Sequence, residues 1–290
     1  MITDLPHAAR RQLGRAVRSR VAGPDAQAKA DRIWRTEGER WFSPGDPIWK
    51  VHADAAMFPA GIRALLLQSL HPLAMAGVAA HSGYKGDAWG RLQRTSEFLA
   101  TTTFGTVDDA QQAIRRVRAI HRRVRGTAPD GRPYAASDPH LLRWVHVAEA
   151  DSFLTAHQHY AAAPLTDAEA DRYVEQAALV AGLLGVEDAP TTVSGLRAAI
   201  ESYRPELEGT PAAREAARFL LVNPPLPLAA RPGYAALAAG EVSMLPRWAR
   251  WPLRLPWLPV TEQLVGRRVG GAATGVVRWA MQAEDPPRLS

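Results

Sequence analysis

The chain has 290 residues, with 35 lysines and arginines against 29 aspartates and glutamates, and its formal net charge is +6. With 47% hydrophobic and 22% charged residues, the composition is that of a globular protein and argues against disorder. The absence of cysteine excludes disulfides, thiolate nucleophiles, cysteine-ligated zinc, iron–sulfur clusters and thiolate-ligated haem. Residues 1–20 carry no secretory signal, and no apolar stretch of about 18 residues occurs, so we expect a soluble cytoplasmic protein.

The hydrophobic periodicity is helical almost throughout, and the alternating pattern of β-strands is missing. In chain order we predict helices over residues 46–54, 59–82 (broken at Pro72), 87–104, 108–125, 138–161, 166–185, 194–203, 211–222 and 261–282. Residues 126–134 are predicted to form a loop, and the prolines between 224 and 259 to make the C-terminal part less regular. The sequence therefore predicts one all-α domain, residues 46–290, preceded by a helical arm, residues 1–45.

Several helix ends can be predicted from single residues. Asp138 precedes a proline and is typical of a helix start. Thr166 and Glu169 form a capping box, in which each side chain hydrogen bonds to the backbone amide of the other. Gly105 and Gly126 are expected to end helices in the left-handed conformation.

Residues 110–126 are the most informative segment. Six arginines spread over one side of the predicted helix, whereas His121 follows Ile114 by seven residues and projects near the apolar stripe. One interpretation is a core histidine with a hydrogen bond to the protein. The other is a neutral imidazole that ligates haem iron, with arginines such as Arg118 and Arg125 available for the haem propionates.

Residues 89–105 place polar groups on an apolar helix face. Arg91 and Thr95 are four residues apart and share that face with Phe98. Burying a guanidinium and a hydroxyl is costly unless something pairs with them. They form either a structural ion pair with another helix or the polar wall of a pocket, where Thr95 could hydrogen bond a bound oxygen species. Arg94 is expected at the rim of such a pocket.

The remaining histidines allow both structural and functional roles. His71 precedes a proline at a helix break, and His81 ends a run of small apolar residues. On the long helix that follows, His146 lies on an apolar side, whereas His157 and His159 are predicted to be exposed. Taken alone, each is expected to be structural; beside a cofactor, His71, His81 and His146 would line its pocket.

The segment 244–260, MLPRWARWPLRLPWLPV, is rich in tryptophan, arginine and proline. Such residues suit a peripheral contact with a membrane surface. The density of proline argues against a regular amphipathic helix and favours a lid or wall that packs on the helical body. Nucleic-acid motifs are missing, as are those of zinc proteases, P-loop proteins, dinucleotide-binding folds and serine hydrolases, so no nucleic-acid partner is expected.

The order of segments resembles a known family. From Phe58 to Val186 the chain contains, in succession, FPAGIRALLLQSLHP, RLQRTSEFLATTTFGT, AIHRRVRGTAPDGRPYAASDPHLLRWVHVAEADSFL and LTDAEADRYVEQAALVAGLLGV. This series is similar to the haem-dependent oxygenases that include latex clearing protein, a rubber oxygenase, and the mycophenolic-acid oxygenase MpaB. The resemblance implies a globin-like all-α core that binds haem b through His121, with Arg91 and Thr95 on the distal side.

The resemblance also implies a reaction. It predicts an enzyme of the oxidoreductase class that oxidises a hydrophobic or aromatic small molecule with O2 or peroxide. Arg94 stands where the rubber oxygenases have a lysine that approaches the iron, so a lysine-ligated state is not expected and rubber is a poor guess for the substrate. Two alternatives remain: a haem or hydrophobic-ligand carrier of the same fold, and a basic helical interaction protein. In the enzyme, the haem pocket would also include Phe98, Arg118, Arg125, His146, His71 and His81.

Overall fold

The computed structural model describes residues 7–23, 25–81, 86–258 and 261–282, and the structural statements below concern these residues. The first half of the chain contains α1 (His7–Ala22), α2 (Ala26–Arg35), α3 (Pro47–Ala53), α4 (Met57–Gln68), α5 (Pro72–His81), α6 (Ala88–Phe104), α7 (Val107–His121), β1 (Arg125–Thr127) and β2 (Pro133–Ala135). The second half contains α8 (Pro139–Tyr160), α9 (Asp167–Leu184), α10 (Val193–Tyr203), η1 (Arg204–Glu206), α11 (Pro211–Leu221), η2 (Leu228–Ala230), α12 (Arg231–Met244), α13 (Arg247–Arg250), η3 (Glu262–Gly266) and α15 (Arg267–Met281). The predicted all-α class is confirmed.

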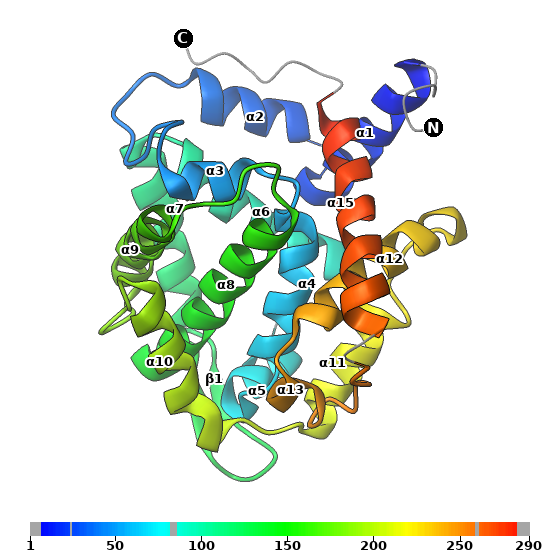
Figure 1. Cartoon of the computed structure of the whole chain (residues 1–290). Helices are drawn as coiled ribbons and strands as arrows, with labels where there is room; N and C mark the ends of the chain where they lie inside the picture. The colour runs from blue at the N-terminus through cyan, green and yellow to red at the C-terminus, as the bar shows by residue number, and fades with distance from the viewer. Residues whose placement is uncertain (1–6, 24, 82–85, 259–260, 283–290) are drawn as a thin grey trace.

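Helices α4 and α8 form the central pair of the fold. Figure 1 shows them crossing the middle of the molecule, with α9 and α10 on one side and α12 and α15 on the other. α4 is apolar around most of its circumference, which is typical of a helix with protein on all sides. Leu66 of α4 and Trp144 and Val147 of α8 are fully buried. The indole nitrogen of Trp144 donates to the carbonyl oxygen of Gln68 at 3.2 Å, so burial leaves that donor satisfied.

A buried ion pair also joins the central helices. Arg63 of α4 is 4% exposed, and its guanidinium lies 2.7 Å from the carboxylate of Asp151 in α8. The same guanidinium donates to the hydroxyl of Ser152 at 2.8 Å. Because a buried charge without a partner is costly, this pair fixes the relative position of α4 and α8.

The helix starts agree closely with the prediction, and two glycine assignments are wrong. Thr166 caps α9 in a complete capping box with Glu169, and the carboxylate of Asp138 accepts from the amide of His140 at the start of α8. Gly105 does end α6, but with φ of −79° it is extended rather than left-handed. A Cβ atom there would lie 2.6 Å from a backbone oxygen, so close approach explains this glycine. Gly126 lies inside β1.

Two elements were not predicted. Residues 125–127 and 133–135 form an antiparallel hairpin, where we expected the end of a helix and a loop. Tyr134 on β2 is buried beneath this hairpin and packs with α5, a long-range contact that no local pattern signals. α12 occupies part of the segment expected to be irregular, because Pro232 lies in its first turn, where proline starts a helix instead of breaking one.

The arm and the C-terminal helix pack on the same part of the molecule. α1 contacts α15 and α6, and Arg10 donates to the carbonyl oxygen of Trp279 at 2.8 Å. α15 in turn crosses α12 at two glycines. A Cβ atom built on Gly270 would lie 2.6 Å from the Tyr160 hydroxyl and 2.7 Å from the Cα atom of Gly240. The absence of side chains at both positions lets the two helices approach.

We therefore expect Gly270→Ala to lower the free energy of unfolding by about 1–3 kcal/mol, because the added methyl group overpacks the crossing. Gly275→Ala, on the same helix, is the matched control, since no atom lies within 4 Å of a Cβ there. Alanine favours a helix interior over glycine by about 0.5–1 kcal/mol, so this variant should be stabilised. Urea unfolding followed by circular dichroism measures both. Equal effects of the two substitutions would contradict the close crossing.

Candidate functional site

Helices α6 and α7, the α6–α7 hairpin, pack against each other and carry three of the predicted site residues, Arg91 and Thr95 on α6 and His121 on α7. The two helices pack together and are joined by only Gly105 and Thr106. Arg91 lies 14 residues before Gly105, and His121 lies 15 residues after Thr106. At a rise of about 1.5 Å per residue, both are therefore about 21–22 Å from the turn. Thr95 follows Arg91 by four residues, so it lies about one helical turn closer to the connection between α6 and α7.

His121 is the last residue of α7 and is partly buried. Its Nδ1 atom is buried and has no hydrogen-bond partner. Burial lowers the pKa of the imidazole, so the ring is neutral at pH 7 and keeps a lone pair for a ligand. A buried ring nitrogen without a protein partner is costly, and it is readily explained by a bound group that the protein chain does not supply.

The polar residues of α6 differ in exposure. Arg91 is partly buried and has an interaction partner, and Phe98 is also partly buried. Thr95 is exposed, so its hydroxyl is accessible. Arg94 is exposed as well, and its guanidinium lies 3.0 Å from the carboxylate of Asp87, the residue that caps α6. Arg94 is thus paired at the surface and has no role inside the hairpin.

The two arginines expected near a cofactor's carboxylates lie on the surface around His121. Arg118, one turn before His121, is exposed and donates to the carbonyl oxygen of Leu183 in α9 at 3.3 Å. Arg125 is exposed at the start of β1. Both remain candidates for carboxylate binding, although Arg118 would have to share its guanidinium with α9.

The remaining predicted histidines are distributed over different parts of the molecule. His81 is exposed at the end of α5, with its ring 6.1 Å from that of Tyr134. His71 is buried, and its ring neighbours are those of His140, Trp144 and Tyr203. The structure therefore places His71 beside His140, at the start of α8, and Tyr203, at the end of α10.

His146 and Glu149 are recessed polar side chains on one face of α8. Burial lowers the pKa of His146 to about 4, with the charge of Arg143 adding to the effect, and the Nε2 atom has no partner. Burial also raises the pKa of Glu149 to about 7. Both side chains nevertheless keep some accessible surface, which is expected of groups that are surrounded by protein but not closely packed. Sequence reasoning missed Glu149, although its spacing of three residues from His146 places it on the same helix face.

A further set of buried polar groups lies between α3, α6 and α8. The Nδ1 atom of His52 is 2.7 Å from the hydroxyl of Thr103, whereas its Nε2 atom has no partner. Burial, together with the nearby His157, lowers the pKa of His52 to about 3. His157 is itself 3% exposed, so the prediction that it faces solvent was wrong. Tertiary packing around the end of α8 buries it, while His159 is exposed as expected.

Helices α3 and α9 connect the parts of the fold that carry these buried histidines. α3 packs against α6, α8 and α9, and α9 packs against α7 and α8. The two helices thus bridge α8 and the α6–α7 hairpin. Among the described residues, α8 itself makes at most slight contact with α6 or α7. Histidine nitrogens without a partner are found before α5 and on three helices of this region, namely in His71, in His52 of α3, in His121 of α7 and in His146 and His157 of α8.

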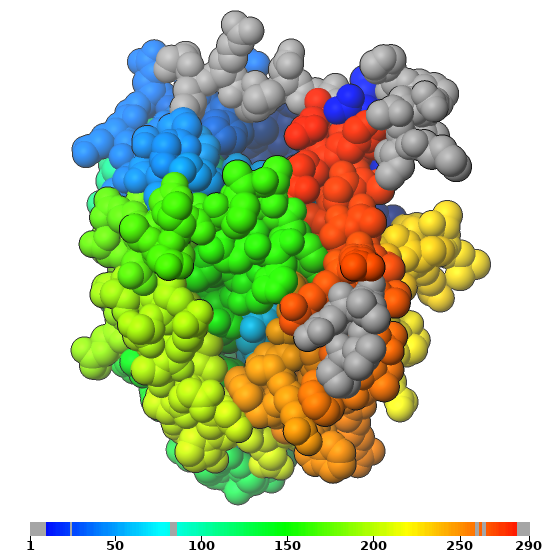
Figure 2. All heavy atoms as spheres, in the orientation of Figure 1, coloured from blue at the N-terminus to red at the C-terminus, as the bar shows by residue number. Residues whose placement is uncertain are grey.

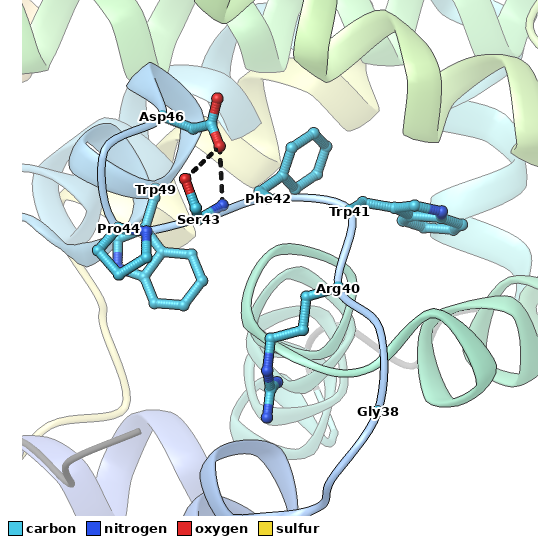
Figure 3. Close-up of a pocket in the computed structure, with 8 residues that line it drawn as sticks. All are labelled: Gly38, Arg40, Trp41, Phe42, Ser43, Pro44, Asp46 and Trp49. Carbon is cyan, nitrogen blue, oxygen red and sulfur yellow. Dashed lines mark hydrogen bonds between the residues drawn. The ribbon is translucent and has the colours of Figure 1, made fainter. Parts of the chain in front are cut away.

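A separate hollow beside α3 has a structural explanation. It has a volume of 370 Å³ and is shown in Figure 3, where it is lined by Gly38, Arg40, Trp41, Phe42, Ser43, Pro44, Asp46 and Trp49. The guanidinium of Arg40 donates to carbonyl oxygens at the ends of α2 and α6. The amide and hydroxyl of Ser43 donate to the carboxylate of Asp46 at 2.7 and 2.8 Å. These polar groups are already used to hold the loop, so we assign no ligand to this hollow.

The tryptophan-rich segment packs on the body, as the lid-or-wall interpretation predicted. Ala249, Arg250 and Leu253 are buried, and Figure 2 shows this orange segment lying against the lower half of the molecule. Trp251, by contrast, is 87% exposed. A groove of 710 Å³ runs among the tryptophans and arginines of 247–257. Contact of 244–260 with a membrane surface stays a prediction.

No single described helix is long and apolar enough to cross a membrane. α4 and α5 together have the length and composition, but the chain bends by 111° at the break between them. Most of α4 is also buried inside the protein.

The fold is an all-α body with a buried, unpartnered imidazole nitrogen at the end of α7 and a guanidinium and a hydroxyl on α6. The family described as "ER-bound oxygenase mpaB/B'/Rubber oxygenase, catalytic domain" matches residues 49–279, more than three quarters of the chain. The chain belongs to this oxygenase family, and the resemblance seen in the sequence is confirmed. No curated protein and no solved structure matches the chain.

The raised pKa of Glu149 predicts a dependence of stability on pH. Because the folded protein holds this proton more tightly than the unfolded chain, whose carboxyl has a pKa near 4.5, stability falls as the pH rises from about 4.5 to about 7. Glu149→Gln removes this loss, so at pH 8 the variant should be more stable than wild type by up to about 3 kcal/mol. Near pH 4.5 the difference should be small.

Chemical unfolding at pH 5 and pH 8 measures this effect. Glu187→Gln, at an exposed position, is the control and should behave as wild type at both values. A Glu149→Gln effect of the same size at both pH values would show that the carboxyl is not desolvated.

Proposed function

We propose that this protein is a haem b-dependent oxygenase that oxidises a hydrophobic or aromatic small molecule with O2 or peroxide. The observation that carries the proposal is the buried, unpartnered Nδ1 atom of His121. It lies on the helix that follows the one carrying Arg91 and Thr95, within the segment that matches the oxygenase family. His121 would ligate the haem iron, and Arg91 and Thr95 would contact the bound oxygen species or substrate.

The residues present fit a haem. Haem iron requires a neutral imidazole, and burial lowers the pKa of His121 in the required direction. Haem propionates require cations, and the exposed arginines Arg118, Arg122 and Arg125 surround His121 in the sequence. When bound, haem supplies the redox-active iron for oxygen chemistry.

The chain's own residues would orient the reactants and handle protons. Arg91 keeps its charge at any physiological pH, so its guanidinium can donate hydrogen bonds to an oxygen species or to a polar group of the substrate. The Thr95 hydroxyl can donate to or accept from the same partner. With a pKa of about 7, the carboxyl of Glu149 can hold a proton or release one near neutral pH, as a general acid or base must. His146, neutral and unpartnered at Nε2, can accept one hydrogen bond.

The ligand assignment predicts the absorption spectrum of the purified protein. We expect a Soret band in wild type and its loss in His121→Ala, because alanine lacks the imidazole nitrogen that is proposed to ligate the iron. His159→Ala is the control, since His159 is exposed on α8 and its Nδ1 atom bonds only to the carbonyl oxygen of Thr155. Unchanged haem content in His121→Ala would remove the assignment. Haem without any oxygen-dependent turnover of alkenes or phenols would indicate a carrier.

The role of Arg91 can be tested without knowing the substrate, through the affinity for cyanide. Loss of a charged hydrogen-bond donor costs about 1.5–3 kcal/mol, so Arg91→Met should bind cyanide roughly 10- to 150-fold more weakly while it keeps its Soret band. Arg94→Met, one turn along α6, is the matched control because Arg94 pairs with Asp87 at the surface. Spectrophotometric titration measures both. Equal cyanide affinity in the two variants would place Arg91 outside the distal side.

A further inference from the structure

Three side chains from distant parts of the sequence converge at the lower end of the molecule in Figure 1, where α5 and α8 begin and α10 ends. His71 immediately precedes α5, His140 lies in the first turn of α8, and Glu206 belongs to η1. One potential ligand atom from each lies within 4.8 Å of the others. Two imidazoles and one carboxylate are the donor set of many transition-metal sites.

His71 is the side chain in this cluster that protein contacts do not explain. It is 1% exposed, and neither of its ring nitrogens has a hydrogen-bond partner. Its Nε2 atom lies 3.4 Å from a carboxylate oxygen of Glu206, close but without hydrogen-bond geometry. Burial lowers its pKa, so the imidazole is neutral and keeps a free lone pair. A buried imidazole in this state is expected to have a partner that the protein does not provide.

His140 is already oriented for ligation. The Tyr203 hydroxyl donates to the carbonyl oxygen of His140 at 2.8 Å and lies 3.4 Å from its Nδ1 atom. Because that hydroxyl proton is used, the Tyr203 oxygen can only accept a hydrogen bond, from Nδ1–H, so a metal ion would bind at Nε2 by displacing the hydrogen there. Metal-binding histidines are held in this way by a hydrogen bond at the other ring nitrogen. Nε2 lies 2.9 and 3.0 Å from the two carboxylate oxygens of Glu206.

The separations between these atoms suit tetrahedral coordination. Bonds of about 2.0–2.2 Å to zinc place neighbouring ligand atoms about 3.3–3.5 Å apart. Glu206 lies 3.4 Å from His71 and 2.9 Å from His140, so small side-chain movements give the required geometry. His140 and Glu206 are exposed, so an ion can reach the cluster from solvent.

We propose that His71, His140 and Glu206 bind one divalent transition-metal ion, for which Zn²⁺ is the best fit, with water in the remaining position. The ion would replace the hydrogen now shared between His140 and Glu206. Two cations act on this region: Arg132, whose guanidinium lies 2.7 Å from the carboxylate of Asp130, and Arg143, whose guanidinium lies 6.0 Å from the ring of Tyr203. Since the ligands come from three separate segments, the ion would join the start of α5, the start of α8 and η1.

Titration of the EDTA-treated full-length protein with ZnCl2 in a calorimeter tests this proposal. We expect one Zn²⁺ per chain with a micromolar or lower Kd, and no heat with MgCl2, because magnesium prefers oxygen ligands. His140→Ala and Glu206→Gln should each weaken zinc binding by more than about tenfold. Both positions are exposed, so neither substitution should prevent folding.

Two controls separate this site from other histidines and acids. His159→Ala on α8 and Glu201→Gln on α10 change exposed residues of the same types and should bind zinc as wild type does. Zn²⁺ should also raise the Tm of wild type and of both controls by a few degrees, but not that of His140→Ala. Absence of zinc binding in wild type, or equal affinity in wild type and both site variants, would overturn the proposal.

Discussion

Burial of polar groups without protein partners is the constraint that distinguishes this molecule from an ordinary helical bundle. An unsatisfied polar atom in a protein interior costs about 1–3 kcal/mol. Several such atoms nevertheless lie inside this fold, among them nitrogens of His52, His121 and His146 and both carboxylate oxygens of Glu241. They come from several elements, since His52 lies on α3, His121 on α7, His146 on α8 and Glu241 on α12. Such atoms do not stabilise the fold, so each is a candidate for contact with a bound group.

The buried arginines show that the same chain can satisfy its interior polar groups. Arg63 pairs with Asp151 and Ser152 between the central helices. Arg250 is 3% exposed, donates to three backbone carbonyl oxygens and pairs with Glu262 at 2.5 Å. These satisfied groups hold the scaffold in place. The buried polar groups without partners do not help to hold the scaffold, so they are the groups available to a ligand.

The proposed haem ligand lies at the end of α7, whereas the histidine–glutamate cluster lies where α5 and α8 begin. His121 follows Arg91 and Thr95 across a single two-residue connection between neighbouring helices. In the cluster, by contrast, the ligands depend on the packing of α5, α8 and η1 against one another. The first arrangement follows from local geometry and the second from tertiary contacts.

The sequence by itself determined most of the helices and the residues that begin α8 and α9, because periodicity and capping act over three or four residues. It also placed His121, Arg91 and Thr95 on two neighbouring helices, and their motif carried the family. Only the tertiary structure decided the β-hairpin, the burial of His157 and the recessed position of Glu149. The pairing of His71 with Glu206 likewise joins residues more than one hundred positions apart. Local patterns report which face of a helix is apolar, but which helix covers that face depends on the packing of the whole chain.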